Sequence, residues 1–118
     1  MKVSEVTELK EGFMCHGAID RILDAPYAKG FEKMAHDVHA VRGFGDFYGH
    51  TWVIRGSADV MIDPVVNPWD VAAIKICVEE AGGRFTDLAG KDTFLGGSGL
   101  STNGILHSKV LKYIEKGD

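Results

Sequence analysis

Two acidic residues in the middle of the chain are the first candidates for chemistry. Asp70 follows Asn67-Pro68-Trp69, a sequence typical of a helix start. A carboxylate there can ligate Mg²⁺, which typically takes one or two carboxylates together with phosphate oxygens. A carboxylate in the first turn also stabilises the helix by about 0.3–1 kcal/mol through the helix dipole, and this alone would explain Asp70 without a ligand. Asp63 could face the same cleft, although Asp before proline is also common in turns.

Three other groups of residues could carry chemistry, and each has a plainer explanation. His36 and His39 have a spacing that suits zinc, but no nearby Cys or carboxylate matches it, so a solvated helix edge explains them better. Cys15-His16 could include a nucleophilic thiol, but a buried strand cysteine is more common. The glycine-rich run 96–99 is not a dinucleotide fingerprint, because Thr102 stands where its last glycine belongs.

The composition is that of one mildly acidic globular domain. The 118 residues include 13 Lys and Arg against 17 Asp and Glu, a net charge of −4. Because the basic residues are scattered, we expect neither nucleic acid nor a membrane as a partner. The chain has no apolar run of about 20 residues and no apolar leader, so we expect a cytoplasmic protein. Cys15 and Cys77 are too few for a disulfide framework and are expected to be buried thiols.

The elements that must position these residues are short strands alternating with helices. Apolar spacing and turn residues predict strands at 1–6, 13–16, 58–62, 84–86 and 100–102 with another ending at Val41, and helices at 31–40, 46–55, 68–81 and 104–116. The inward face of the 68–81 helix is predicted to be Trp69, Ala72, Ala73, Ile76 and Cys77. This alternation predicts an α/β layered domain with a mixed, mainly parallel sheet flanked by helices. Ligands gather where strand ends meet helix N-termini, and segments 45–47 and 67–70 lie at such places.

A series of motifs resembles the inositol monophosphatase family in both order and spacing. The motifs are Arg42-Gly-Phe-Gly-Asp-Phe-Tyr-Gly-His50, Gly56-Ser-Ala-Asp-Val60, Asp63, Pro68-Trp-Asp-Val-Ala-Ala73, Glu80-Ala-Gly-Gly83, Thr86-Asp-Leu-Ala-Gly90 and Ser101-Thr-Asn-Gly104. The Trp-Asp-x-Ala-Ala helix that ends in Glu-Ala-Gly-Gly is the family's C-terminal signature. The Gly-Asp-Phe-Tyr-Gly-His run at 45–50 and the Asp63-Pro64 pair are closer to the histidinol-phosphatase branch than to the inositol branch.

The resemblance extends over essentially all 118 residues, but it matches only the C-terminal half of the family. Family members are hydrolases that cleave phosphate monoesters with Mg²⁺, whose ions bind phosphate oxygens and activate a water. Most of their metal ligands come from an N-terminal Glu and an Asp-Pro-x-Asp-Gly-Thr motif, and this sequence contains neither. The resemblance therefore implies a single domain, residues 1–118, that lacks the N-terminal metal-binding half. It leaves open whether the chain alone is an enzyme.

The resemblance also implies roles for the two acidic residues. Asp70 matches the metal-ligating aspartate of the C-terminal half and would also lie near substrate oxygens. Asp63 matches the acid that recognises the non-phosphate end of the substrate. In the histidinol branch, a carboxylate at that position suits a cationic amine or imidazolium.

A second set of substrate-binding residues is implied by the motif that begins at Arg42. Gly45, Asp46 and Phe47 match a segment at a helix start that contacts substrate, and Arg42 matches a nearby anion or structural contact. Inositol-type members tend to have a small hydroxyl residue where this chain has Asp46. This difference argues against polyol substrates.

Two hypotheses follow for the function. The first is the C-terminal part of a Mg²⁺-dependent phosphomonoesterase of the histidinol-phosphate or inositol-phosphate type, inactive alone because one carboxylate holds Mg²⁺ too weakly. It would need a complementary N-terminal half. The second is a non-catalytic remnant or an oligomerising interaction module, because the loss of half of an active site exposes an apolar face that a second copy could cover as a homodimer.

Overall fold

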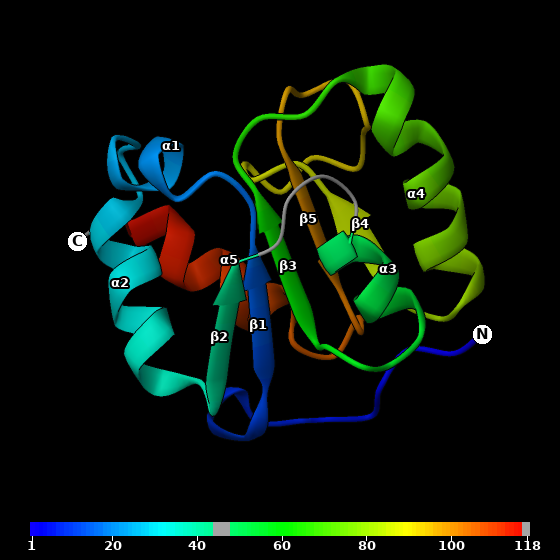
Figure 1. The fold of residues 1–118 in the computed structure, drawn as a ribbon, viewed down its shortest axis with the longest axis horizontal. Helices are drawn as coiled ribbons and strands as arrows, with labels where there is room; N and C mark the ends of the chain where they lie inside the picture. Colours follow the sequence, from blue (N-terminus) through cyan, green and yellow to red (C-terminus); the bar gives the residue numbers. More distant parts are fainter. Residues whose placement is uncertain (44–47, 117–118) are drawn as a thin grey trace.

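The computed structural model describes residues 1–43 and 48–116. A five-stranded sheet lies between two layers of helices (Figure 1). In chain order the elements are η1 (Leu9–Glu11), β1 (Phe13–His16), α1 (Ile19–Leu23), α2 (Ala28–Asp37), β2 (Ala40–Gly43), α3 (Tyr48–Ile54), β3 (Val60–Asp63), α4 (Pro68–Glu80), β4 (Arg84–Thr86), β5 (Gly99–Thr102) and α5 (His107–Lys116). Within these ranges no helix has the length and apolar character needed to cross a bilayer.

The sheet has the order β2-β1-β3-β5-β4. β1 pairs in parallel with both β2 and β3, whereas β5 pairs antiparallel with β3 and β4. β5 therefore runs opposite to the other four strands. This arrangement confirms the predicted mixed sheet flanked by helices.

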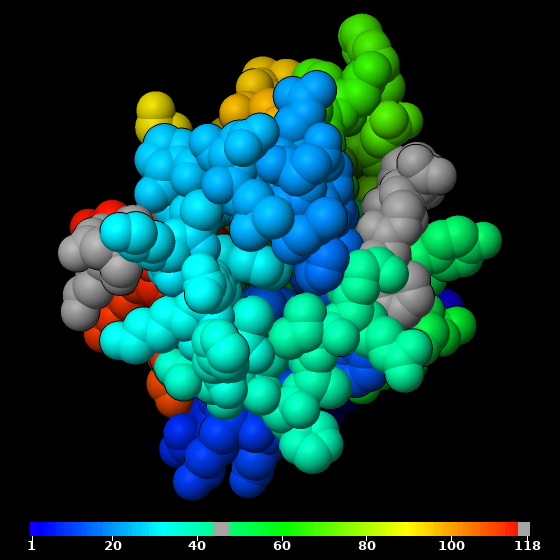
Figure 2. Space-filling model, turned by 60° about the vertical axis from the view of Figure 1, so that its left-hand side comes forward, coloured from blue at the N-terminus to red at the C-terminus, as the bar shows by residue number. Residues whose placement is uncertain are grey.

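Side chains alternate along the strands between two buried layers. Met14 and Ile62 point toward α2 and α5, where they pack with Met34. Their neighbours Cys15 and Met61 point to the opposite side and pack with α3. Figure 2 shows the outer surface of the first layer, where the side chains of α1 and α2 cover the near face. Because each buried large apolar side chain contributes about 1.5–3 kcal/mol, these two layers hold β1 and β3 in place.

Helix α2 begins and ends earlier than its sequence pattern predicts. The predicted helix began at Phe31 with Gly30 outside it, but Gly30 lies inside α2 and is buried. A Cβ at this position would lie 1.9 Å from the carbonyl oxygen of Tyr113 in α5. Glycine therefore lets the two helices pack closely, and this contact outweighs its poor helix propensity of about 1 kcal/mol.

The predicted strand at residues 1–6 is wrong. The segment makes no ladder with any described strand; the Val3 N–H donates to the Ala81 carbonyl oxygen at 3.0 Å, beyond the end of α4. The Ser4 hydroxyl also donates to the buried Asp59 carboxylate. These contacts hold the segment in place without a strand partner, which a local pattern of β-branched residues does not reveal.

Helix α4 has the predicted start but a different buried face. The Asn67 side chain accepts a hydrogen bond from the Trp69 N–H at 3.1 Å, a cap that contributes about 1 kcal/mol. The buried residues are Val71, Ile74 and Val78, which pack with Phe85. Of the predicted inward residues, Ala72 is half-buried, and Trp69, Ala73, Ile76 and Cys77 are exposed. Both faces of α4 are apolar, so the sequence pattern alone does not determine which one packs on the sheet.

The two cysteines differ in their surroundings, and the prediction that both are buried is wrong for one of them. Cys15 is buried and Cys77 is exposed on α4. Burial raises the pKa of the Cys15 thiol to about 12, and the negative charge of Asp59 contributes to the rise. At neutral pH Cys15 is therefore a protonated thiol, which is a poor nucleophile.

His107 is fully buried at the start of α5 and is held by two threonine hydroxyls. The Thr86 hydroxyl donates to the Asp87 carbonyl, so it accepts the Nε2–H of His107 at 2.8 Å. Nδ1 of the neutral ring then accepts the Thr102 hydroxyl at 2.8 Å. Burial, together with a smaller contribution from the positive charge of Arg84, lowers the pKa of His107 to about 4.

Acid is therefore expected to destabilise the fold through His107. The unfolded chain binds a proton at this histidine near its ordinary pKa of 6.5, whereas the folded chain binds it near pH 4. The free energy of unfolding should fall as the pH is lowered between these values, by up to about 3 kcal/mol from this group. Urea unfolding at pH 7 and pH 4.5 measures the fall, which should be smaller in His107→Gln than in the exposed control His36→Gln. Equal falls in the two variants would contradict this assignment.

Candidate functional site

The carboxyl ends of β1, β2 and β3 meet at one edge of the sheet. His16, the last residue of β1, is in register with Gly43 of β2 and with Ile62 of β3, next to Asp63. Helix α4 begins near the same edge (Figure 1). In sheets of this type, ligands bind where parallel strands end and helices begin.

Asp63, the last residue of β3, is a partly buried carboxylate at this edge. Its side chain is 16% exposed, and its Oδ2 lies 3.5 Å from Nε2 of His50. A Cβ on Gly17 would lie 2.9 Å from the other oxygen, Oδ1. Burial raises the pKa of Tyr27, and the negative charge of Asp63 raises it further. Asp63 is thus a half-buried carboxylate with one oxygen beside a histidine and the other beside a glycine.

His50 is a site residue to which the sequence analysis gave no role. Its ring is fully buried on α3, and Nδ1 lies 2.6 Å from the Ser101 hydroxyl. Nε2 has no hydrogen-bond partner within residues 1–43 and 48–116. The ring packs against Phe85 with the centroids 6.0 Å apart. In the sequence, the Gly-His pair at 49–50 was the signal that could have pointed to His50. Glycine at 49 lets α3 pack closely on β3, because a Cβ there would lie 2.0 Å from the Met61 sulfur.

Asp70 and Arg42, the other described site residues, are exposed to solvent. Asp70 lies in the first turn of α4, as predicted. Arg42 lies on β2 at the edge of the sheet. The structure thus places Asp63 beside His50 and Gly17, whereas the side chains of Asp70 and Arg42 are exposed to solvent.

The amino-acid sequence matches the inositol monophosphatase family over residues 3–117. The chain belongs to this family. It is 36% identical over 117 residues to a histidinol-phosphatase of Mycobacterium tuberculosis, a match that covers 99% of this chain and 45% of the relative. It is 31% identical over 118 residues to a fructose-1,6-bisphosphatase/inositol-1-monophosphatase of Thermotoga maritima, with 98% and 44% covered.

Solved structures of inositol monophosphatases have the same fold. An enzyme from Anabaena is 30% identical with a TM-score of 0.84, and the match covers 98% of this chain and 48% of the other. One from Thermotoga maritima is 29% identical with a TM-score of 0.86, and 99% and 45% are covered. The chain therefore matches the C-terminal half of these relatives and spans less than half of their length.

The family is generally one of metal-dependent phosphatases, but the described residues do not form a metal centre. Within residues 1–43 and 48–116, no three His, Cys, Asp or Glu side chains are grouped so that they could hold an ion. His36 and His39 are both exposed, and His39 lies beyond the end of α2. Asp70 by itself offers one carboxylate, which is fewer ligands than a tightly held Mg²⁺ needs.

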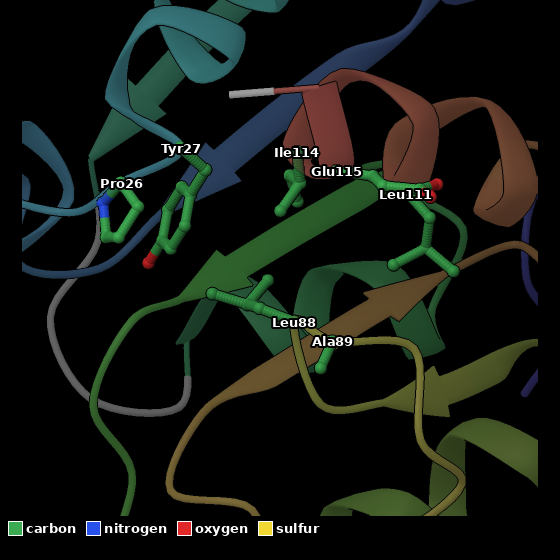
Figure 3. A pocket seen from close by; sticks show the side chains of 7 residues that line it. All are labelled: Pro26, Tyr27, Leu88, Ala89, Leu111, Ile114 and Glu115. Atoms are coloured by element: carbon green, nitrogen blue, oxygen red, sulfur yellow. The ribbon is translucent and has the colours of Figure 1, made fainter. Parts of the chain in front are cut away.

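Three predicted substrate-binding residues, Gly45, Asp46 and Phe47, lie outside the described residues. A pocket of about 650 Å³ is found elsewhere, between α5 and the loops that carry Tyr27 and Leu88 (Figure 3). Its lining is mainly apolar, with Leu111 and Ile114 of α5, and it includes none of the predicted site residues that the structure describes.

Proposed function

We propose that this chain is the C-terminal half of a Mg²⁺-dependent phosphomonoesterase that acts with a complementary N-terminal half. The chain supplies Asp70 as one metal ligand and Asp63 as the residue that binds the non-phosphate end of the substrate. Alone it has negligible activity, because one exposed carboxylate does not organise a two-metal site. Its unpaired thiols suit the reducing cytoplasm, which we propose as its compartment.

An exposed apolar stripe on α4 is the observation that carries this proposal. Trp69, Ala73, Ile76 and Cys77 form the stripe, here called the α4 face, and Trp69 is 84% exposed and Ile76 60% exposed. Exposed apolar faces of this kind usually mark a binding surface. Asp70, Ala73 and Cys77 have i, i+3, i+7 spacing, so Asp70 lies along the α4 face. A partner that covers this face brings its own ligands to Asp70.

The proposed substrate is a phosphate ester whose other end is a cation. Asp63 is half-buried, and a carboxylate in such a place binds an ammonium or imidazolium group more strongly than a neutral hydroxyl. The relatives that are named histidinol-phosphatases match this chain at up to 36% identity. Histidinol phosphate fits this description better than inositol phosphate, and we propose the histidinol-phosphate type first.

Reconstitution tests the proposal. The chain is mixed with the separately expressed N-terminal half of a histidinol-phosphatase relative, and phosphate release from histidinol phosphate and inositol phosphate is measured with Mg²⁺. We expect turnover from the mixture and none from either half. Ile76→Asp should prevent association, since a charge on the α4 face would be buried by the partner. Ile19→Asp, on the exposed surface of α1, is the matched control and should associate normally.

Other results would contradict the proposal. Enzyme-like turnover by the purified chain would show that it needs no partner. Self-association through the α4 face without turnover in the mixture would favour the oligomerising module instead. Ultracentrifugation of the chain and of Ile76→Asp distinguishes these cases.

A further inference from the structure

The buried side of Asp63 is contacted by a chain of two further side chains. Asp63 Oδ2 lies 3.5 Å from Nε2 of His50, and Nδ1 of His50 lies 2.6 Å from Oγ of Ser101. The three residues come from β3, α3 and β5, and β5 is the neighbour of β3 in the sheet. These are the residue types of a serine-nucleophile triad, so their role has to be decided by access.

Ser101 does not serve as a nucleophile. It is fully buried on β5, a strand that is paired on both sides, and it is in register with Met61 and Phe85. The His50 ring of α3 covers its hydroxyl, so no substrate can reach it without moving that helix. The side chain of the three that reaches solvent is Asp63. The contacts of Ser101 and His50 therefore affect Asp63, which is the residue that can meet a ligand.

The contacts determine which nitrogen of His50 carries a proton. Nε2 is completely buried and faces the carboxylate of Asp63. A lone pair at Nε2 would repel that carboxylate, whereas an N–H at Nε2 attracts it. With the proton on Nε2, the neutral ring accepts the Ser101 hydroxyl at Nδ1, and both ring nitrogens then face groups of opposite polarity.

We propose that His50 is a positioning residue that holds the Asp63 carboxylate for a cationic ligand. The Nε2–H of His50 attracts Oδ2, and Ser101 fixes the ring that carries this proton. Oδ1 is left to accept an ammonium or imidazolium N–H. Gly17 keeps that oxygen accessible, because a side chain there would lie 2.9 Å from Oδ1. The ligand class rests on the proposed function, but the position of the proton does not.

Nitrogen-15 NMR of the full chain tests the position of the proton. The two-bond couplings from the ring protons of His50 should show a protonated Nε2. In Ser101→Ala the ring loses its partner at Nδ1, and the proton should divide between the two nitrogens. His107, the other fully buried histidine, has its ring nitrogens bonded to Thr86 and Thr102 and should keep its signals. An unprotonated Nε2 in the wild-type chain would overturn the inference.

Binding of L-histidinol to the full chain tests the consequence, with inositol as the neutral probe. His50→Phe, which lacks a donor, should weaken histidinol binding about tenfold, the effect of losing an interaction with a charged group. His50→Gln should restore most of the affinity, because its amide can donate toward Oδ2. His107→Gln, a change at a buried histidine away from Asp63, should leave the dissociation constant unchanged. Equal affinities for His50→Phe and wild type would overturn the positioning role.

A failure of the proposed function would give a result different from a failure of the positioning role of His50. If the wild-type chain binds histidinol no better than inositol, the proposed substrate class is wrong. The NMR result at His50 then still decides whether the histidine holds Asp63.

Discussion

Replacing Asp70 with asparagine is expected to lower the kcat of the reconstituted phosphatase by about 100-fold or more. The change removes one negative charge and one anionic oxygen from the proposed metal site, and losses of this kind greatly weaken Mg²⁺ binding. The side chain is exposed in the first turn of α4, so the fold should be preserved. Raising the Mg²⁺ concentration should recover part of the activity, because the substitution acts through metal affinity.

Asp20→Asn is the matched control for this prediction. Asp20 is also an exposed aspartate in the first turn of a helix, the shorter α1, so the variant loses the same charge at an equivalent position. Its kcat and its Mg²⁺ dependence should equal those of the wild-type mixture. If Asp70→Asn retained full activity at limiting Mg²⁺, Asp70 would not be a metal ligand, and its position would be explained by helix stability alone.

Replacing Gly30 with alanine is expected to produce the largest loss of stability among single-methyl changes in α2. The new Cβ would lie 1.9 Å from a backbone oxygen of α5, which cannot rotate away as a side chain can, so the two helices must separate. Overpacking of this kind costs about 1–3 kcal/mol and occasionally more, whereas the gain in helix propensity is about 1 kcal/mol. Because the clash is with backbone, we expect a net loss of about 1–2 kcal/mol in the free energy of unfolding, measured by urea denaturation.

The control for Gly30→Ala is a change to alanine at an exposed position of the same helix. Glu32→Ala should change the free energy of unfolding by less than about 0.5 kcal/mol. A Gly30→Ala chain as stable as the wild type would mean that α2 and α5 can shift apart at little cost. The close packing of α2 against α5 would then contribute little to the stability of the layer that covers β1 and β3.

The sequence was most informative where a local signal has one physical cause. Asn67 and Pro68 specify a helix start because one accepts an N–H and the other lacks one, and α4 begins there. The order and spacing of the motifs from Arg42 to Gly104 identified the family, and the match over residues 3–117 confirms it. Asp63 was selected by that spacing, and it lies at the carboxyl end of the parallel strands.

Local patterns failed where two solutions are equally favourable until the chain folds. Both faces of α4 are apolar, and the packing of Val71, Ile74 and Val78 on Phe85 decides which face is buried. A β-branched N-terminal segment suits a strand, but the free groups at the end of α4 bind it instead. These choices depend on neighbours that are distant in the sequence.

The sequence by itself determined the family and the start of α4, and it selected Asp63 and Asp70 as site candidates, because each of these depends on residue type and short spacing. The tertiary structure alone decided that Asp63 lies against His50 and that Ser101 lies behind His50, since these residues are separated by up to 51 positions along the chain. It also decided that the α4 face is exposed, because burial depends on which surfaces remain after the sheet has been covered. Side-chain contacts across strands and helices exist only once the strand order is set.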